Sequence, residues 1–153
     1  MSKIPRFAEY AAAFEKSFAS DDWSLVEPYF TEDAEYEGGL GPPFTPEQGS
    51  CVRGRAAVLG YFEKALDAFD RRFATREVTL LEGPREEGVE VWIRGRADYT
   101  SPLAPDLSFE LEEIATFEGD RIRRLEDRYD DATIEALGAY LEAHGAKLGF
   151  GAG

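Results

Sequence analysis

The strongest constraint on the fold lies in the second half of the chain, where four segments with β-strand composition follow one another closely. They cover residues 75–81, 89–100, 107–117 and 121–129. Turn-forming residues separate them, namely Gly83-Pro84, Pro102 with Pro105, and Gly119-Asp120. Such short connections join antiparallel neighbours, so this half predicts an antiparallel meander.

The first half and the carboxyl end show helical periodicity instead. Apolar residues recur at helical spacing over residues 6–19, 55–73 and from Asp131 onward, and a short helix limited by Pro28 is expected near residues 23–30. A brief strand is expected at 34–37, followed by a Gly/Pro-rich loop through residue 50. This order predicts an α+β fold.

The composition is that of one compact domain. The chain has 153 residues, 43% of them hydrophobic, and its 31 acidic against 17 basic residues give a net charge of −14. Such a charge repels phosphate backbones and anionic lipid, so neither nucleic acid nor a membrane is an expected partner. The single Cys51 and the absence of an apolar leader pattern favour a cytoplasmic protein. We expect one domain over residues 1–148 and a flexible tail over 149–153.

The strand at residues 90–98 has one charged and one apolar face. Its alternating side chains are Glu90, Trp92, Arg94, Arg96 and Asp98 against Val91, Ile93, Gly95 and Ala97. If the charged face lies in water, it forms a row of cross-strand ion pairs that contribute little stability. The alternation alone leaves open which face is buried.

The last strand places an acidic residue between two large apolar ones. Leu125, Asp127 and Tyr129 share one face. Because Leu125 and Tyr129 should leave water, Asp127 should be buried with them and needs a hydrogen-bond donor. We expect that donor to be Arg96 on a neighbouring strand.

Four segments carry a family resemblance: FASDDWSLVEPYFTEDAEY, GRAAVLGYF, GRADY and GDRIRRLEDRYD. Through them the chain resembles the superfamily of ketosteroid isomerases, nuclear transport factors and SnoaL-like polyketide cyclases, and most closely the limonene-epoxide hydrolases. Arg96-x-Asp98 with the distal Asp127 matches the Arg-x-Asp and Asp of that hydrolase family. Tyr36 stands where the family has a water-binding tyrosine, and Gly38 replaces the family's asparagine.

The resemblance spans residues 10–141 and implies a cone-shaped fold like that of nuclear transport factor 2. In it a strongly curved mixed or antiparallel sheet wraps around helices and encloses a deep pocket for a small-molecule ligand. The charged face of residues 90–98 then turns inward. The implied substrate-binding residues are Phe14, Phe18, Phe62, Leu66, Trp92, Arg94, Leu111, Glu113, Leu125 and Tyr129.

The chemistry implied is addition of water to a small, largely apolar epoxide. One carboxyl protonates the departing oxygen and another deprotonates the water, and two carboxylates sharing an arginine can hold one proton near neutral pH. By resemblance Asp98 is the acid, Asp127 the base, Arg96 the bridge and Tyr36 the residue that holds the water. No metal or other cofactor is implied.

Alternatives remain beside this hydrolase. The three charged residues can form an ion network that only satisfies itself. A related cyclase or isomerase can use Arg94 and Glu113 to recognise a more polar substrate, although Phe14 and Gly38 stand where ketosteroid isomerases carry their proton-transfer residues. A non-catalytic ligand-binding domain is the third alternative. His144 and Cys51 lack partners for a catalytic group and are expected to have no such role.

A homodimer is also expected. With the charged face inward, Val91, Ile93, Gly95 and Ala97 form an apolar patch on the convex side of the sheet, joined by Ile114 and Thr116. A patch of that breadth seldom stays exposed on a soluble monomer. We expect a two-fold dimer centred on this patch, with Arg124, Glu126 and Arg128 at its rim.

Overall fold

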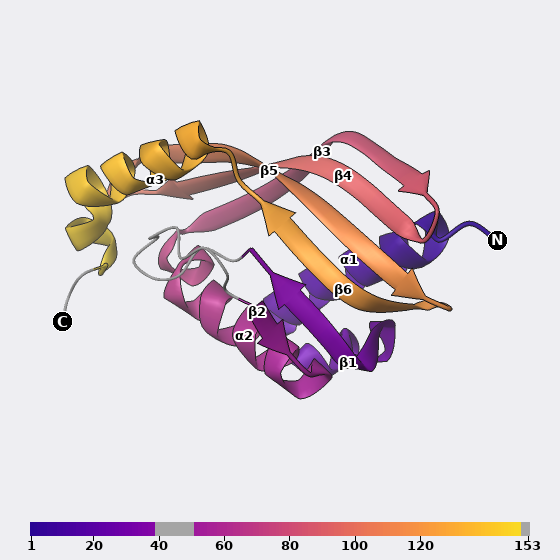
Figure 1. Ribbon diagram of the computed structural model, residues 1–153. Coiled ribbons are helices and arrows are strands. Elements are labelled where there is room, and N and C mark those ends of the chain that lie inside the picture. The colour runs from indigo at the N-terminus through magenta and orange to yellow at the C-terminus, as the bar shows by residue number, and fades with distance from the viewer. Residues whose placement is uncertain (39–50, 151–153) are drawn as a thin grey trace.

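The computed structural model describes residues 1–38 and 51–150 of the chain. Its helices are α1 (Ile4–Ser20), α2 (Arg55–Ala68) and α3 (Asp131–His144), with short 3-10 turns η1 (Trp23–Leu25), η2 (Glu27–Tyr29), η3 (Asp70–Arg72) and η4 (Gly145–Leu148). Its strands are β1 (Phe30–Glu37), β2 (Cys51–Arg53), β3 (Thr75–Glu87), β4 (Glu90–Ser101), β5 (Ala104–Glu118) and β6 (Arg121–Arg128). The predicted α+β order of elements is confirmed (Figure 1).

The strands form one mixed sheet in the order β2-β1-β6-β5-β4-β3. β3 to β6 are antiparallel neighbours as expected, whereas β1 lies parallel to β6. Gly83-Pro84 does not end a strand, because β3 continues through it with a shift of register against β4. Residues 39–50 of the expected loop lie outside the described residues, and so do residues 151–153 of the expected tail. Phe150 of that tail packs against Phe69, with ring centroids 5.5 Å apart.

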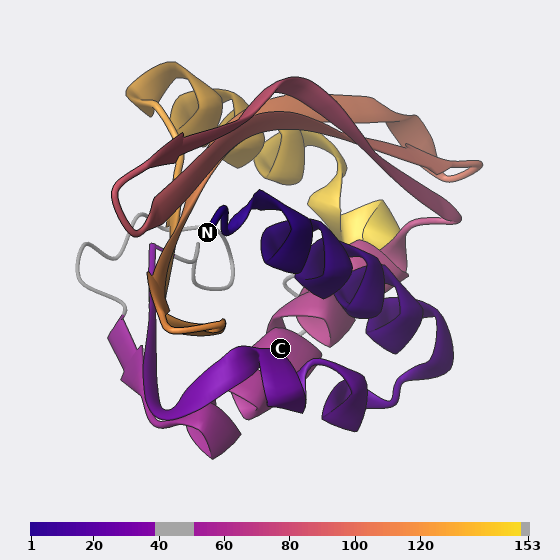
Figure 2. The same cartoon turned by 90° about the vertical axis from the view of Figure 1, so that its right-hand side faces the viewer.

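The sheet curves around the first two helices. Figure 2 shows α1 lying beneath the arch of β3, β4 and β5, with α2 and β1 on the opposite side of the interior. α3 packs at the far end of β5. No helix in the two described ranges is both long and apolar enough to cross a membrane.

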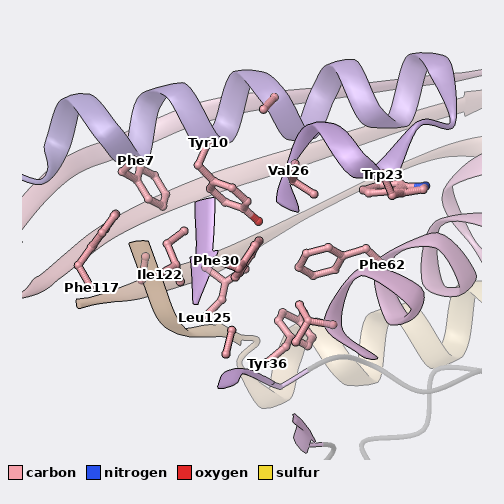
Figure 3. Packing of buried hydrophobic residues seen from close by; sticks show 14 of the residues in the cluster. Phe7, Tyr10, Trp23, Val26, Phe30, Tyr36, Phe62, Phe117, Ile122 and Leu125 are labelled. Carbon is pink, nitrogen blue, oxygen red and sulfur yellow. The ribbon is translucent and has the colours of Figure 1, made fainter. Parts of the chain in front are cut away.

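Aromatic side chains dominate the packing between helices and sheet. Tyr10 and Phe14 of α1 meet Phe30 and Phe62 edge to face, with the Tyr10–Phe30 and Phe14–Phe62 centroids each 5.4 Å apart. Figure 3 shows Tyr10, Phe30 and Phe62 in this cluster. A second cluster joins Phe69, Phe73 and Tyr99 to Leu137 of α3. Aromatic pairs of this geometry contribute about 0.5–1.5 kcal/mol each beyond the area they bury.

The inward assignment of the charged face of β4 is wrong. Val91 is fully buried and Ala97 is 3% exposed, whereas Arg94 and Arg96 bear their guanidinium groups on the outer face. The reason is the hydrophobic effect. The apolar side chains of β4 lie on the concave face, away from water, and the charged side chains lie on the outer face, where they stay hydrated.

The outer face carries a network of ion pairs. Arg94 bridges Glu82 of β3 and Glu110 of β5, and Arg124 pairs with Glu37 and Glu126. The other outer side chains of β4 follow the same pattern: Arg96 pairs with Asp98 at 3.0 Å, and Trp92 stacks under Arg85 with 4.1 Å from the guanidinium carbon to the ring centroid.

The apolar dimer surface is therefore also wrong. Val91, Ile93, Gly95 and Ala97 face the interior, where α1 and the cavity adjoin them. The homodimer itself stays a prediction, but this patch no longer supports it.

Candidate functional site

A cavity of about 470 Å³ lies between the concave face of the sheet and helices α1 and α2. Its wall is mostly aromatic and aliphatic, and its size is that of pockets that hold small organic ligands. Three polar side chains, Tyr36, Glu113 and Asp127, meet in this wall. They come from β1, β5 and β6, the three neighbouring strands at the centre of the sheet.

Tyr36 holds Asp127 by a direct hydrogen bond. The parallel pairing of β1 with β6 sets Tyr36 opposite Leu125, one inward position from Asp127. The Tyr36 hydroxyl donates to Oδ2 of Asp127 at 2.5 Å. The other carboxylate oxygen, Oδ1, is buried and has no fixed donor among the described residues.

Glu113 is the direct cross-strand neighbour of Asp127. Burial raises the pKa of Glu113 well above its usual range, and the adjacent charge of Asp127 raises it further. Burial also raises the pKa of Asp127, while hydrogen bonds from Glu113 and Tyr36 favour its ionised form. The raised pKa of Glu113 favours its protonated, neutral form beside Asp127.

Gly38 permits the close approach that places Asp127. Its φ of +98° is one that other residues rarely adopt, and a Cβ there would lie 1.9 Å from the backbone oxygen of Asp127. The family's asparagine has no room at this position. The glycine is thus part of the geometry of the site rather than a missing water contact.

A second polar group closes another part of the wall. Arg76 of β3 pairs with Asp70 at 2.7 Å and with Glu15 of α1 at 2.6 Å, and Tyr99 donates to Asp70 at 2.8 Å. Burial raises the pKa of Asp70, and the guanidinium of Arg76 opposes that rise. These ion pairs hold α1 against the edge strand β3. The positive charge of Arg76 is already paired with two carboxylates.

The structure brings together only part of the predicted site. Tyr36 and Asp127 line the cavity together with Phe14, Phe62, Leu66, Leu111, Glu113, Leu125 and Tyr129. Arg96, Asp98, Trp92 and Arg94 lie on the outer face, and Phe18 packs beneath Arg71 and Arg76 outside the cavity wall. The expected pair of Asp127 with Arg96 is wrong, because side chains on opposite faces of a sheet cannot meet.

Several wall residues were not predicted. They include Tyr10 and Glu15 of α1, Tyr61 of α2, Asp70, Arg76, Ile93, Gly95, Ala97, Tyr99 and Phe109. Those on β4 and β5 share the parity of Leu111 and Glu113, so a correct register would have identified them. Among the residues of the two described ranges, no three His, Cys, Asp or Glu side chains form a metal-binding group.

Comparisons with known proteins agree with this architecture. TerC, co-crystallized with polyporic acid, superposes with a TM-score of 0.64 at 18% identity over 90% of this chain and 98% of that one. A putative polyketide cyclase from Sinorhizobium meliloti gives 0.55 at 19% identity over 78% and 94%. An LEH-like epoxide hydrolase from M. tuberculosis gives 0.60 at 16% identity over 88% and 91%. At these identities the likeness concerns the fold alone.

A search of curated proteins found no match. The model of the SnoaL-like domain matches residues 9–125, which is most of the chain. Together with the curved mixed sheet, this match establishes that the chain belongs to the SnoaL-like domain family.

Proposed function

We propose that this chain is an enzyme that moves a proton on a small, largely apolar carbonyl compound, as an isomerase or a cyclase does. The observation that carries the proposal is the pair of partly buried carboxyl groups of Glu113 and Asp127, with Tyr36 fixing Asp127, in the wall of a mostly apolar cavity. Paired carboxyl groups whose surroundings drive their pKa values apart supply an acid and a base at one place.

The two carboxyl groups have different tasks. A carbonyl oxygen that enters the cavity takes over the hydrogen bond from protonated Glu113, which frees the carboxylate of Asp127. Asp127 then accepts a proton from the carbon next to the carbonyl, and Glu113 stabilises the negative charge that develops on oxygen. Tyr36 keeps Asp127 in place and ionised.

The enolate formed in this step can react in two ways, and each returns the proton from Asp127. If Asp127 returns its proton to another carbon of the same molecule, the reaction is an isomerisation. If the enolate carbon attacks a second carbonyl of the molecule, a ring closes and the new alkoxide takes the proton. Both outcomes keep the atoms of the substrate and need no external reagent.

This reaction class is preferred over hydrolysis of an epoxide. The resemblance to the epoxide hydrolases was carried most specifically by Arg96-x-Asp98, and both side chains lie on the outer face, paired with each other at 3.0 Å. The acid next to Asp127 is Glu113, and the sequence resemblance aligns it with the oxyanion-stabilising acid of the ketosteroid isomerases. A carbonyl oxygen is the group that such a neutral acid stabilises best.

Deuterium exchange tests the proposal. Small neutral ketones, 2-acetylnaphthalene among them, are incubated with the protein in D₂O, and loss of the proton next to the carbonyl is followed by NMR. We expect the protein to accelerate exchange and Asp127→Asn to remove the acceleration by about 100-fold or more, the usual range for a general base. Asp98→Asn is the matched control and should exchange at the wild-type rate.

Two results would contradict the proposal. One is exchange that Asp127→Asn leaves intact. The other is a protein that exchanges none of the ketones but converts simple epoxides into diols with oxygen from labelled water. The second result would assign Glu113 and Asp127 to the addition of water.

A further inference from the structure

We propose that the hydroxyls of Tyr10, Tyr61 and Tyr129 bind oxygen atoms of the ligand, so that the pocket selects an uncharged molecule bearing carbonyl or hydroxyl groups. This inference rests on the proposed function and narrows its substrate class. It concerns three side chains to which the proton transfer described above gives no task.

These hydroxyls are unused within the protein. Tyr36 and Tyr99 each donate to a carboxylate, whereas no hydrogen bond engages the hydroxyl of Tyr10, Tyr61 or Tyr129 in the part of the chain that the structure describes. All three line the cavity. A buried tyrosine hydroxyl usually finds a partner. Here the partner available is a group inside the cavity.

The three donors approach the cavity from different sides. Tyr10 projects from α1 into the interior with its hydroxyl at the end away from the helix (Figure 3). Tyr61 comes from α2 and packs on Tyr36, with ring centroids 5.0 Å apart. Tyr129 follows β6 and packs on Phe109 at 6.1 Å. Oxygen substituents at separate positions on one ligand can therefore be bound together.

The three phenols stay protonated in this setting. Burial raises the pKa of Tyr10 and Tyr129 well above the usual range and also raises that of Tyr61. The charge of Asp127 adds to the rise in each case. They remain neutral donors, suited to a carbonyl or hydroxyl oxygen.

The charges of the cavity disfavour an anionic ligand. Glu15, Asp70, Glu113 and Asp127 lie in its wall against Arg76, which is already bound to two of them. The only other cation among the described wall residues, Lys64, is exposed to solvent, and the sequence of residues 39–50 contains no basic residue. A carboxylate entering this cavity would lose its hydration without gaining a counter-charge.

The test compares three molecules of matched shape. 2-Acetylnaphthalene carries a neutral oxygen, 2-ethylnaphthalene carries none, and 2-naphthoate carries a charge. Equilibrium dialysis measures their binding to the wild type and to Tyr10→Phe and Tyr129→Phe, with Tyr140→Phe as the control because Tyr140 bonds to the backbone of Pro105 outside the cavity. We expect the ketone to bind best and the naphthoate worst.

Because the ketone has one oxygen, at least one of the two pocket variants should weaken its binding by about three- to tenfold, the effect of one hydrogen bond, and both should leave binding of 2-ethylnaphthalene unchanged. Unchanged binding of the hydrocarbon shows that the pocket is intact. Naphthoate binding as tightly as the ketone, or variants that weaken ketone and hydrocarbon equally, would overturn the inference.

The outcome is separable from the test of proton transfer. Selective ketone binding without deuterium exchange would remove the proposed function. Exchange that depends on Asp127 with equal binding of all three molecules would remove this inference instead.

Discussion

Replacing Gly38 with alanine should damage both the stability and the site. Gly38 and Gly54 both have positive φ, +98° and +94°, so alanine meets a similar backbone penalty at each, about 1–3 kcal/mol. At Gly54 a Cβ meets nothing within 4 Å, whereas at Gly38 it lies 1.9 Å from the Asp127 oxygen. Because Cβ contacts under 3.0 Å essentially never occur, β1 and β6 must separate locally by about 1.1 Å.

That separation has two measurable effects. Weakening one or two ladder hydrogen bonds costs about 0.5–1.5 kcal/mol each, so urea unfolding should show Gly38→Ala about 1–3 kcal/mol less stable than Gly54→Ala. Moving Asp127 by about 1 Å should slow the deuterium exchange on the order of 100-fold, while Gly54→Ala keeps its rate. If the two variants match in both assays, the close approach of Gly38 to Asp127 has no role in the site.

Three further predictions concern the carboxyl groups. Tyr36→Phe removes the donor to Asp127, which costs about 1–3 kcal/mol in urea unfolding and raises the pKa of Asp127, so the acid limb of the exchange rate should move to higher pH; an unmoved limb would contradict Asp127 as the base. Because the folded-state pKa of Glu113 is raised well above its ordinary 4.5, its ionisation opposes folding, and wild-type stability should fall as pH rises above 4.5. Glu113→Gln should flatten that fall, and identical pH profiles would show that Glu113 ionises freely. Arg96→Ala, which breaks the outer pair with Asp98, should leave the rate of deuterium exchange unchanged. Loss of exchange in this variant would support the triad expected from the sequence.

Much of the fold could be predicted because its signals are local. The helical spacing in α1 and the turn residues around the meander each depend on a few neighbouring residues. The 3-10 turns at η1 and η2 and the shortened α2 differ from the predicted helices, since Pro28 and the turn at Asp70 interrupt the hydrogen-bond pattern. The prediction that Gly83-Pro84 ends a strand was wrong because β3 continues through both residues with a shift of its register against β4.

The face of β4 could not be predicted from alternation because the register decides it. Gly95 pairs with Leu111 and Ile93 with Glu113. Two expectations, that Leu111 and Glu113 face inward and that Arg96 does so as well, therefore exclude each other. The register depends on the number of residues in the turn between β4 and β5. The alternation of side chains within either strand gives no information about that number.

The partner of Asp127 could not be predicted for a different reason. Leu125 and Tyr129 indicate a buried carboxyl group, and a cation is its common companion. Here a proton on Glu113 and the hydroxyl of Tyr36 take that place. Such pairing depends on contacts between distant strands, and the sequence offers several candidate donors of equal merit.

The parallel pairing of β1 with β6 also determines when the site comes into being. Tyr36 and Asp127 are 91 residues apart, whereas the contacts among β3, β4 and β5 join neighbours in the chain. Closing so large a loop is entropically costly, and non-local pairings of this kind form late in folding. A partly folded chain can therefore possess the hairpins and helices, with Glu113 already beside Asp127, while Tyr36 is still apart from both. The site is thus complete only when β1 has paired with β6 at the edge of the meander, and Tyr36 then reaches Asp127.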